Sequence, residues 1–341
     1  MKKILLLTLL SALLLSSFSC GKTDAGTDTE TDEESYVMTD ISGIGSPLKI
    51  DGEEVPYAVF RYYYAAVKYR YDRDNDSYWD KNDYTEKIRN EVLRYIRRNY
   101  AVYSLASQYN VELDEMDKRK IKQDLYTQRV SQYENDYAYY QMLDAYFLTE
   151  DVNCYVEETA ALEDKLFEYL TSMDSGPKIS SDTALVKRYL DNYVIRADHI
   201  LILNDEGDDE NENETLIKEL YEKLKNGADF EELKEQYSED DETKYDDVGY
   251  YMAKNDISEI LSDAAFSLSE GEISGVITAP YGYHIVKRLA KDDEYIKSNL
   301  DKYFVSFYRQ HIFEEMLNKQ KDKQTIIYDE SFYTYTPRTI K

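Results

Sequence analysis

The sequence predicts an α+β protein in which a compact unit of strands and helices is inserted into a mostly helical domain. Apolar and aromatic residues recur at helical spacing up to about residue 191 and again from residue 292. Between these blocks, apolar runs at 194–203 and 283–289 have the length and composition of buried strands. We therefore expect a helical domain made of two halves that are far apart in the sequence, with the strand-containing unit between them.

The chain begins with the features of a secretory leader. Two lysines precede an apolar stretch at 4–15, which is too short to span a bilayer, and small residues lead to Cys20. A Cys at this point indicates bacterial lipoprotein processing, in which residues 1–19 are removed and Cys20 carries the lipid. Ser17 stands where such leaders usually have Leu, so an ordinary secreted protein with a chance Cys is the alternative.

The charge of the chain limits its partners. The formal net charge is −28, and removal of the two leader lysines makes it more negative still. This argues against nucleic acid as a partner, because phosphate contacts need a basic surface, and against electrostatic attachment to anionic lipid. The acyl chains on Cys20 are then the expected membrane anchor. Residues 20–46 are acidic and poor in large apolar residues, so we expect a disordered tether there.

The flanking segments 47–192 and 291–341 are expected to form the helical domain. Their apolar spacing predicts helices over 56–71, 84–109, 114–130, 134–148, 150–173, 182–191 and 292–324. Asp114 and Thr149 stand where they can cap two of these helices, and Asn110 is the expected end of the second helix.

The two halves of the helical domain carry strand-like ends, at 48–50 and 326–328, that can pair and close the domain. Most of the 36 tyrosines of the chain lie in these halves. Two interpretations of them remain open. The rings either pack half-buried between helices, or they form an exposed surface for extended polypeptide, because a Tyr ring buries much area while its hydroxyl stays wet.

The unit between the two halves contains two of the three histidines of the chain. By the period of two in a strand, residues 194–203 place His199 on one face together with small and apolar residues. His284 lies in the apolar run 283–289. A single His in an apolar strand is most simply a hydrogen-bonded core residue. Two histidines that frame one compact unit favour a paired site.

The other elements of this unit are loops, two-turn to three-turn helices and strands. The run 205–214 carries seven acidic residues and is predicted to be a solvated loop. Helices are expected at 215–226, ended by Gly227, and from Asp229 as a cap. A further helix at 258–268 and a strand at 273–278 complete the unit.

Several motifs of this unit resemble those of a known family. The blocks R-A-D-H-I-L-I, N-G-A-D-F-E-E-L-K-E-Q-Y-S-E-D, D-V-G-Y-Y, D-A-A-F-S-L-S-E-G-E-I-S-G and P-Y-G-Y-H-I-V-K follow one another between residues 196 and 287. In order and spacing they resemble the parvulin family of peptidyl-prolyl cis/trans isomerases. The resemblance implies a small antiparallel sheet with surrounding helices for residues 193–290. The organisation of the whole chain resembles the PrsA-like foldase lipoproteins, which have a SurA-like helical domain.

The resemblance also implies a site. The residues that fall on the family's catalytic and polar core positions are His199, Asp240 and His284. The residues that fall on its proline pocket are Ile257, Leu261 and Tyr281, although family members commonly have Met and Phe in place of the first two. The family often has Thr two residues before this Tyr, bonded to the histidine pair, and here that residue is Ala279.

We therefore expect an extracytoplasmic foldase, lipid-anchored to a bacterial membrane, with weak isomerase activity on X-Pro bonds and with chaperone activity. Its partners are unfolded or partly folded exported polypeptides. Isomerisation breaks no bond, so neither a cofactor nor a metal is expected. The acidic run 205–214 argues against phosphate-directed substrates, because like charge repels phosphate.

Two other functions stay open at this point. A non-catalytic chaperone that uses a degenerate parvulin fold to bind peptide is the leading alternative, since Ala279, Ile257 and Leu261 depart from the family pattern. A surface adhesion or structural lipoprotein is the third. The sequence leaves the oligomeric state and the clients open.

Overall fold

The computed structural model describes residues 36–72, 76–80, 83–172, 178–204, 210–245, 248–254, 256–279 and 281–340. The predicted leader, Cys20 and residues 21–35 of the predicted tether lie outside this range, as do residues 205–209 of the acidic run. The chain divides into two compact units, one of Met1–Ile179 with Ile312–Lys341 and one of Ser180–His311. Within the described ranges, no helix combines the length and apolarity needed to cross a bilayer.

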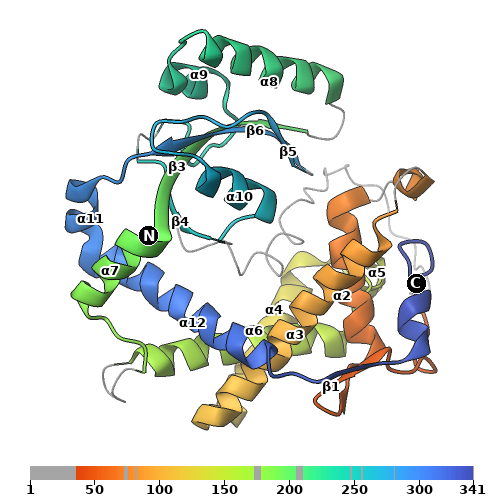
Figure 1. Ribbon diagram of the computed structural model, residues 1–341. Coiled ribbons are helices and arrows are strands. Elements are labelled where there is room, and N and C mark those ends of the chain that lie inside the picture. The colour runs from red at the N-terminus through yellow and green to blue at the C-terminus, as the bar shows by residue number, and fades with distance from the viewer. Residues whose placement is uncertain are drawn as a thin grey trace. The chain divides into compact units, whose positions relative to one another are not determined.

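A small antiparallel sheet joins the two ends of the first unit. Its central strand β1 (Leu48–Ile50) lies between β2 (Glu53–Glu54) and β7 (Ile326–Tyr328) (Figure 1). Leu48 is opposite Tyr328 and Ile50 is opposite Ile326. The predicted pairing of the two distant strand-like ends is thus confirmed.

Helices make up most of the first unit. They are α2 (Tyr57–Asp72), η1 (Asp76–Asp80), α3 (Thr85–Tyr109), α4 (Glu115–Gln132), α5 (Asp136–Ala145), α6 (Glu150–Thr171), η3 (Glu330–Thr334) and the end of α12 (Val305–Lys321). The side chain of Asp114 accepts from two amides of α4, and that of Thr149 caps α6. Asn110 ends α3 with a left-handed φ of 53°. These three predicted ends are confirmed.

Residues 36–46 were expected to belong to the disordered tether, yet they contact the first unit. The Tyr36 hydroxyl donates to Asp144 Oδ2 at 2.9 Å, and the Thr39 hydroxyl donates to the same atom at 3.0 Å. Ile41 packs against the hydrophobic cluster around α2 and α3. This part of the predicted tether is attached because the Asp144 carboxylate and an apolar surface hold it.

The second unit contains a four-stranded antiparallel sheet in the order β4-β3-β6-β5. Its strands are β3 (Val194–Leu203), β4 (Tyr250–Ala253), β5 (Ile277–Ala279) and β6 (Gly282–Leu289). Its helices are α7 (Thr183–Tyr193), α8 (Glu210–Lys225), α9 (Phe230–Tyr237), α10 (Glu259–Ser267), α11 (Asp293–Asn299), η2 (Leu300–Phe304) and the start of α12. The α+β fold class is as predicted.

Helices cover both faces of this sheet (Figure 1). Ile200 and Ile202 of β3 pack in one hydrophobic cluster with residues of α8 and α9. Ile195 and Ala197 pack in another with residues of α10. Since side chains alternate along a strand, the two clusters lie on opposite faces. The helices α7 and α11 join a third cluster with Tyr251 of β4, so the compact unit is wider than the 193–290 expected for the inserted domain.

Two segments differ from the sequence prediction. The helix α8 begins at Glu210, so the acidic run is helical from that residue instead of forming a loop to residue 214. Acidic side chains are favourable in the first turn of a helix, where the dipole is positive. The predicted strand 273–278 is reduced to β5 and one isolated bridge at Ile273. Gly275 interrupts it, and glycine weakens a strand interior.

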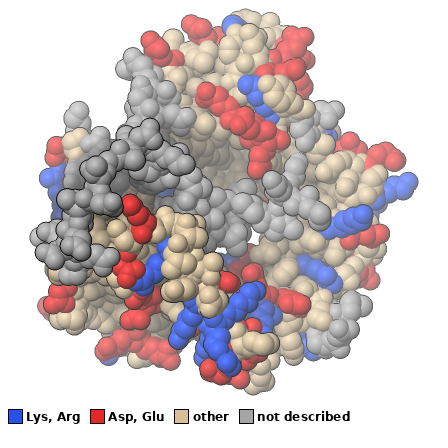
Figure 2. All heavy atoms as spheres, turned by 180° about the vertical axis from the view of Figure 1, so that it is seen from behind, with Lys and Arg blue, Asp and Glu red and all other residues tan. Residues whose placement is uncertain are grey.

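Charged side chains of both signs lie on the described surface. On the face shown in Figure 2, Asp and Glu are widely spread, and Lys and Arg gather in a few places among them. The excess of acids agrees with the formal net charge of −28.

Candidate active site

His199 and His284 of the second unit lie on neighbouring strands, on the face that α10 covers. In the pairing of β3 with β6, His199 is opposite Val286 and Leu201 is opposite His284. The two histidines are therefore diagonal neighbours on one face. Their Nδ1 atoms are 3.3 Å apart, and their ring centroids are 5.1 Å apart. The structure brings together the pair that the sequence suggested.

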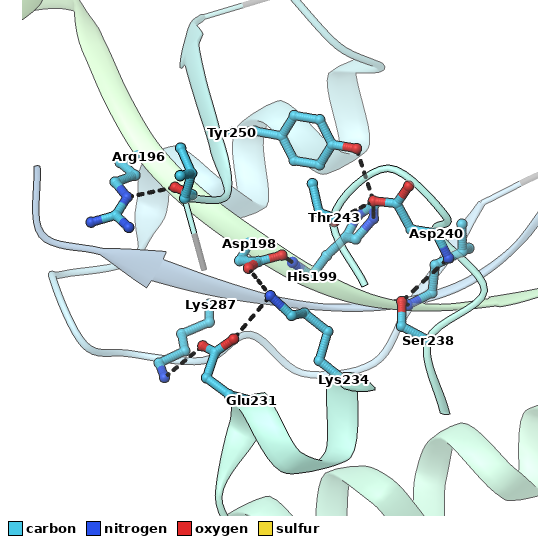
Figure 3. Close-up of polar contacts among 12 residues, drawn as sticks. Arg196, Asp198, His199, Glu231, Lys234, Ser238, Asp240, Thr243, Tyr250 and Lys287 are labelled. Carbon is cyan, nitrogen blue, oxygen red and sulfur yellow. Dashed lines mark hydrogen bonds and ion pairs between the residues drawn. The ribbon is translucent and has the colours of Figure 1, made fainter. Parts of the chain in front are cut away.

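Asp240 extends this pair into a chain of hydrogen bonds, and Figure 3 shows Asp240 beside His199, Thr243 and Tyr250. Its Oδ2 atom lies 3.0 Å from His199 Nε2. The same oxygen accepts from the Tyr250 hydroxyl at 2.8 Å and from the Thr243 hydroxyl at 2.5 Å. Sequence reasoning missed Tyr250 and Thr243 as parts of the site. Tyr250 belongs to the matched block D-V-G-Y-Y, and Thr243 stands three residues after the carboxylate, so both had a local signal.

The charge state of this chain follows from its contacts. Burial alone would raise the pKa of Asp240, but hydrogen bonds from His199, Thr243 and Tyr250 outweigh burial and hold this pKa well below its usual range. Ionised Asp240 is an acceptor only, so His199 Nε2 must carry a proton and donate. Burial of Tyr250 and its bond to the carboxylate raise the pKa of the Tyr250 hydroxyl, which keeps it a donor.

His284 is the inner member of the pair. Its side chain is fully buried, and burial together with the neighbouring His199 lowers the pKa of His284 to about 3. A His199 ring that carries its single proton on Nε2 accepts at Nδ1, and in that tautomer His284 Nδ1 is the donor. Nε2 of His284 is then an acceptor, and among the described residues it has no hydrogen-bond partner.

Ala279 lies on the same face of the sheet as His284. Ile277 of β5 is opposite His284, and Ala279 follows two residues later on the same face. The residue opposite Ala279 is Gly282, which has no side chain to place there. The Ala279 methyl is buried and offers no hydrogen bond.

The three residues expected to form the proline pocket lie on the same side of the sheet. Leu261 of α10 is buried, and Ile257 packs beside it in the cluster that includes Val286 of β6. The ring of Tyr281 stands at 90° to the ring of His284, with centroids 5.2 Å apart. Tyr281 remains partly exposed, so an apolar surface continues from the buried histidine toward solvent.

Comparison with known proteins agrees with this geometry. Residues 199–290 match the family described as Rotamase: PPIC-type PPIASE domain. The chain is 33% identical over 132 residues to the Foldase protein PrsA of Bacillus subtilis (strain 168), which covers 38% of this chain and 42% of that protein. It is 41% identical over 101 residues to the Foldase protein PrsA 2 of Bacillus anthracis, or 29% of this chain and 32% of that protein. The matches thus span less than half the length of these curated relatives.

The crystal structure of PrsA from Bacillus subtilis is similar over 72% of this chain and 88% of that chain, with 24% identity and a TM-score of 0.28. A TM-score this low says nothing about how the two units are arranged. The family match over residues 199–290 and the site both lie in the second unit. The chain therefore contains a parvulin domain of the PPIC-type peptidyl-prolyl isomerase family.

Proposed function

We propose that this protein is an extracytoplasmic foldase whose parvulin domain isomerises X-Pro bonds in unfolded exported polypeptides. The observation that carries the proposal is the hydrogen-bonded chain of Asp240, His199 and His284 beside an apolar surface. We further propose that the helical segments expected over 47–192 and 291–341, without residues 180–192 and 291–311 that belong to the second unit, act as one chaperone-like domain, which the pairing of β1 with β7 supports.

The proposed chemistry is rotation about one amide bond. The barrier of about 18–20 kcal/mol comes from amide resonance, and uncatalysed X-Pro exchange is slow enough to limit folding. In the planar amide, resonance places negative charge on the carbonyl oxygen, and this charge decreases as the bond twists. A site that is dry and carries negative charge beside that oxygen therefore favours the twisted state over the planar one.

The residues can be given roles in this scheme. The proline ring packs against Ile257 and Leu261, where water is excluded. The carbonyl faces the histidine pair, and ionised Asp240 sets the electrostatic potential of that pair. Since no covalent bond breaks, His199 and His284 hold their protons throughout and do not act as acid and base.

A protease-coupled isomerisation assay with a Pro-containing peptide tests this function. The wild type is expected to accelerate cis-to-trans exchange, and the double variant His199→Ala/Asp240→Ala is expected to lose the acceleration. Circular dichroism of the variant controls for folding. An absence of acceleration by micromolar wild type, or an equal rate in a folded double variant, contradicts the proposal.

We propose that the lipid on Cys20 holds the protein at a bacterial membrane, on the basis of the leader sequence alone. Expression in a bacterial host with a labelled fatty acid tests this anchor. Label in the wild type and none in Cys20→Ser supports acylation, and membrane fractionation of the two forms reports the location. Equal membrane association of both forms argues against it.

A second candidate function is a chaperone that binds peptide without catalysis. The buried His284 Nε2, which lacks a partner among the described residues, and the Ala279 methyl on the same face of the sheet favour this candidate. Suppression of aggregation of an unfolded client that survives in His199→Ala/Asp240→Ala, together with no isomerase activity in the wild type, supports this candidate over the first.

A further inference from the structure

A buried ion pair lies behind the histidine chain, on the opposite face of β3. Lys234 Nζ of α9 is 2.6 Å from Asp198 Oδ2, and both side chains are almost fully buried. Asp198 directly precedes His199, so the two side chains point to opposite faces of the strand. Figure 3 shows Lys234 between Asp198 and Glu231, with its ammonium directed at the strand. Neither the isomerase chemistry nor the proline pocket uses this pair.

The second carboxylate oxygen of Asp198 binds the backbone of the site. Its Oδ1 accepts from the backbone N–H of His199 at 2.7 Å. The pairing of β3 with β4 ends at Ala197, so this amide lies beyond the end of that ladder. The carboxylate is therefore bound both to α9 and to the backbone of the histidine that contacts Asp240.

The segment after α9 continues the edge of β3 where β4 ends. Two alternate backbone amides of β3 donate to side chains of this segment, Leu201 to Ser238 and Leu203 to Glu239. The alternate amide before them, that of His199, donates to Asp198 of β3 itself. The backbone amide of Glu239 donates in return to Leu201 O at 2.8 Å. This segment leads directly to Asp240, so the position of α9 determines where the Asp240 carboxylate stands relative to His199.

The buried ion pair holds α9 against β3. Burial would lower the pKa of Lys234, but hydrogen bonds to Asp198 and Glu231 raise it above its ordinary value, so the ammonium stays charged. Burial raises the pKa of the Asp198 carboxyl, which Lys234 opposes. We take the pair as ionised at neutral pH because each Asp198 oxygen has a donor and Lys234 has a second carboxylate at 2.9 Å. A charged pair in this position has little freedom to move, since separation would leave both charges buried.

We propose that Asp198 and Lys234 are positioning residues that hold the backbone of His199 and the segment carrying Asp240 in register. This role rests on the proposed isomerase function of the same site. Its structural part, the alignment of the bond between His199 and Asp240, is measurable whether or not the protein is an enzyme. The pair differs from a simple core contact because it joins the two elements that supply the two partners of that bond.

The test uses the double variant Asp198→Asn/Lys234→Met in the full-length chain. Asn keeps an acceptor for the His199 amide and Met keeps the stem of the lysine, so the charges are removed together with little change of volume. With three histidines in the chain, ¹⁵N-histidine NMR is readily assigned, and His311 serves as an internal reference. We expect the hydrogen-bonded Nε2–H signal of His199 to broaden or shift while the signals of His311 stay unchanged, and kcat/KM to fall about tenfold.

Two control variants separate positioning from stability. Glu231→Gln removes the half-exposed partner of Lys234 and keeps the buried pair, so it is expected to leave the His199 signal unchanged. Ile217→Val trims a buried side chain of α8 and provides a modest loss of stability without touching the pair. If the double variant does not fold, Asp198→Asn alone carries the same prediction, because Lys234 keeps Glu231 as a partner.

A folded variant with wild-type His199 and His284 signals overturns the proposal, as does an equal change in Ile217→Val. If the wild type itself shows no isomerase activity, the proposed function fails, and the NMR comparison still decides whether the pair positions His199.

Discussion

The two ends of the hydrogen-bond chain in the site differ in how completely their polar atoms are paired. At one end, Asp240 Oδ2 accepts from His199, Tyr250 and Thr243, and Oδ1 accepts from the Glu242 amide at 3.1 Å. At the other end, His284 is fully buried, and its Nε2 has no partner among the described residues.

This difference indicates which part of the site is fixed and which is adjustable. A charged acceptor with several donors holds its geometry strongly, because each lost bond leaves a buried donor unpaired. The orientation of the His284 ring depends on one hydrogen bond to His199 and on the edge-to-face contact with Tyr281. We therefore expect substitutions at the Asp240 end to cause large losses of activity or stability. Substitutions near His284 are expected to cause smaller changes, which can be gains or losses.

The largest expected effect is a loss of stability in acid, caused by protonation of His284. Its folded pKa is lowered to about 3 from an ordinary 6.5, so the unfolded chain binds this proton more readily between these values. Stability from this group is fully present above pH 6.5 and is lost as the pH falls, with a limiting slope of about 1.4 kcal/mol per pH unit. Urea unfolding between pH 7 and 4 measures this slope.

The control for this measurement is His284→Asn, whose side chain does not titrate in the range. The free energy of unfolding is expected to depend less steeply on pH in the variant. The difference in slope corresponds to at most one proton, or about 1.4 kcal/mol per pH unit. His199 and His311 are present in both proteins, so the difference between the two slopes reports the replacement of His284. Parallel curves for wild type and variant contradict the lowered pKa.

Removal of the Asp240 carboxylate is expected to give the next largest effect. Asp240→Ala leaves the donors of His199, Tyr250 and Thr243 without their shared acceptor, and it removes the negative charge from the site. We expect kcat/KM to fall about a hundredfold, the size seen when one preorganised electrostatic group is lost. The protease-coupled assay measures this loss. Glu242→Ala, which keeps the backbone amide that bonds Asp240, is the control, and equal losses in both variants contradict a special role for Asp240.

Local sequence signals were enough for some features of the fold and site. Asp114, Thr149 and Asn110 end helices through contacts with their own neighbours, so their type and position predict their role. The pairing of His199 with His284 follows from strand periodicity once both segments are read as strands of one sheet.

Other features depend on contacts that the sequence does not display. Lys234 is almost fully buried although it lies among acidic neighbours that suggest an exposed helix face, because its partner Asp198 comes from a strand 36 residues earlier. The attachment of residues 36–46 depends on Asp144, which is still further away in the chain. Charged groups at such separations pair according to tertiary structure, which neither composition nor periodicity specifies.

Removal of one hydrogen-bond donor to Asp240 is expected to have a moderate effect on stability. Tyr250→Phe removes one hydrogen bond to a charged acceptor, so we expect the free energy of unfolding to fall by about 1.5 kcal/mol. The pKa of Asp240 should rise, because this bond is one of three that hold it down. The stability that a lowered carboxyl pKa contributes is present above the pKa of the unfolded chain and is lost as the pH falls through the pKa of the folded protein. The variant should therefore lose stability in acid at a higher pH than the wild type does.

Urea titrations of wild type and Tyr250→Phe at pH 7 and at acid pH measure both effects. Tyr245→Phe, which alters an exposed hydroxyl in the same region of the chain, is the control and is expected to behave as the wild type. If the acid-induced loss of stability occurs at the same pH in Tyr250→Phe and in the wild type, the remaining donors hold the carboxylate without Tyr250.

The smallest expected effect is a gain, at the less paired end. Ala279→Thr places a hydroxyl on the face of the sheet that carries His284. If that hydroxyl donates to His284 Nε2, it supplies the missing partner and restricts the ring. One net hydrogen bond corresponds to an increase in kcat/KM of about threefold. Ala279→Val adds the same volume without a donor, so it separates hydrogen bonding from packing. An equal gain in the Val variant, or an unchanged Nε2 shift of His284 in the Thr variant, shows that the unpaired nitrogen does not limit the site.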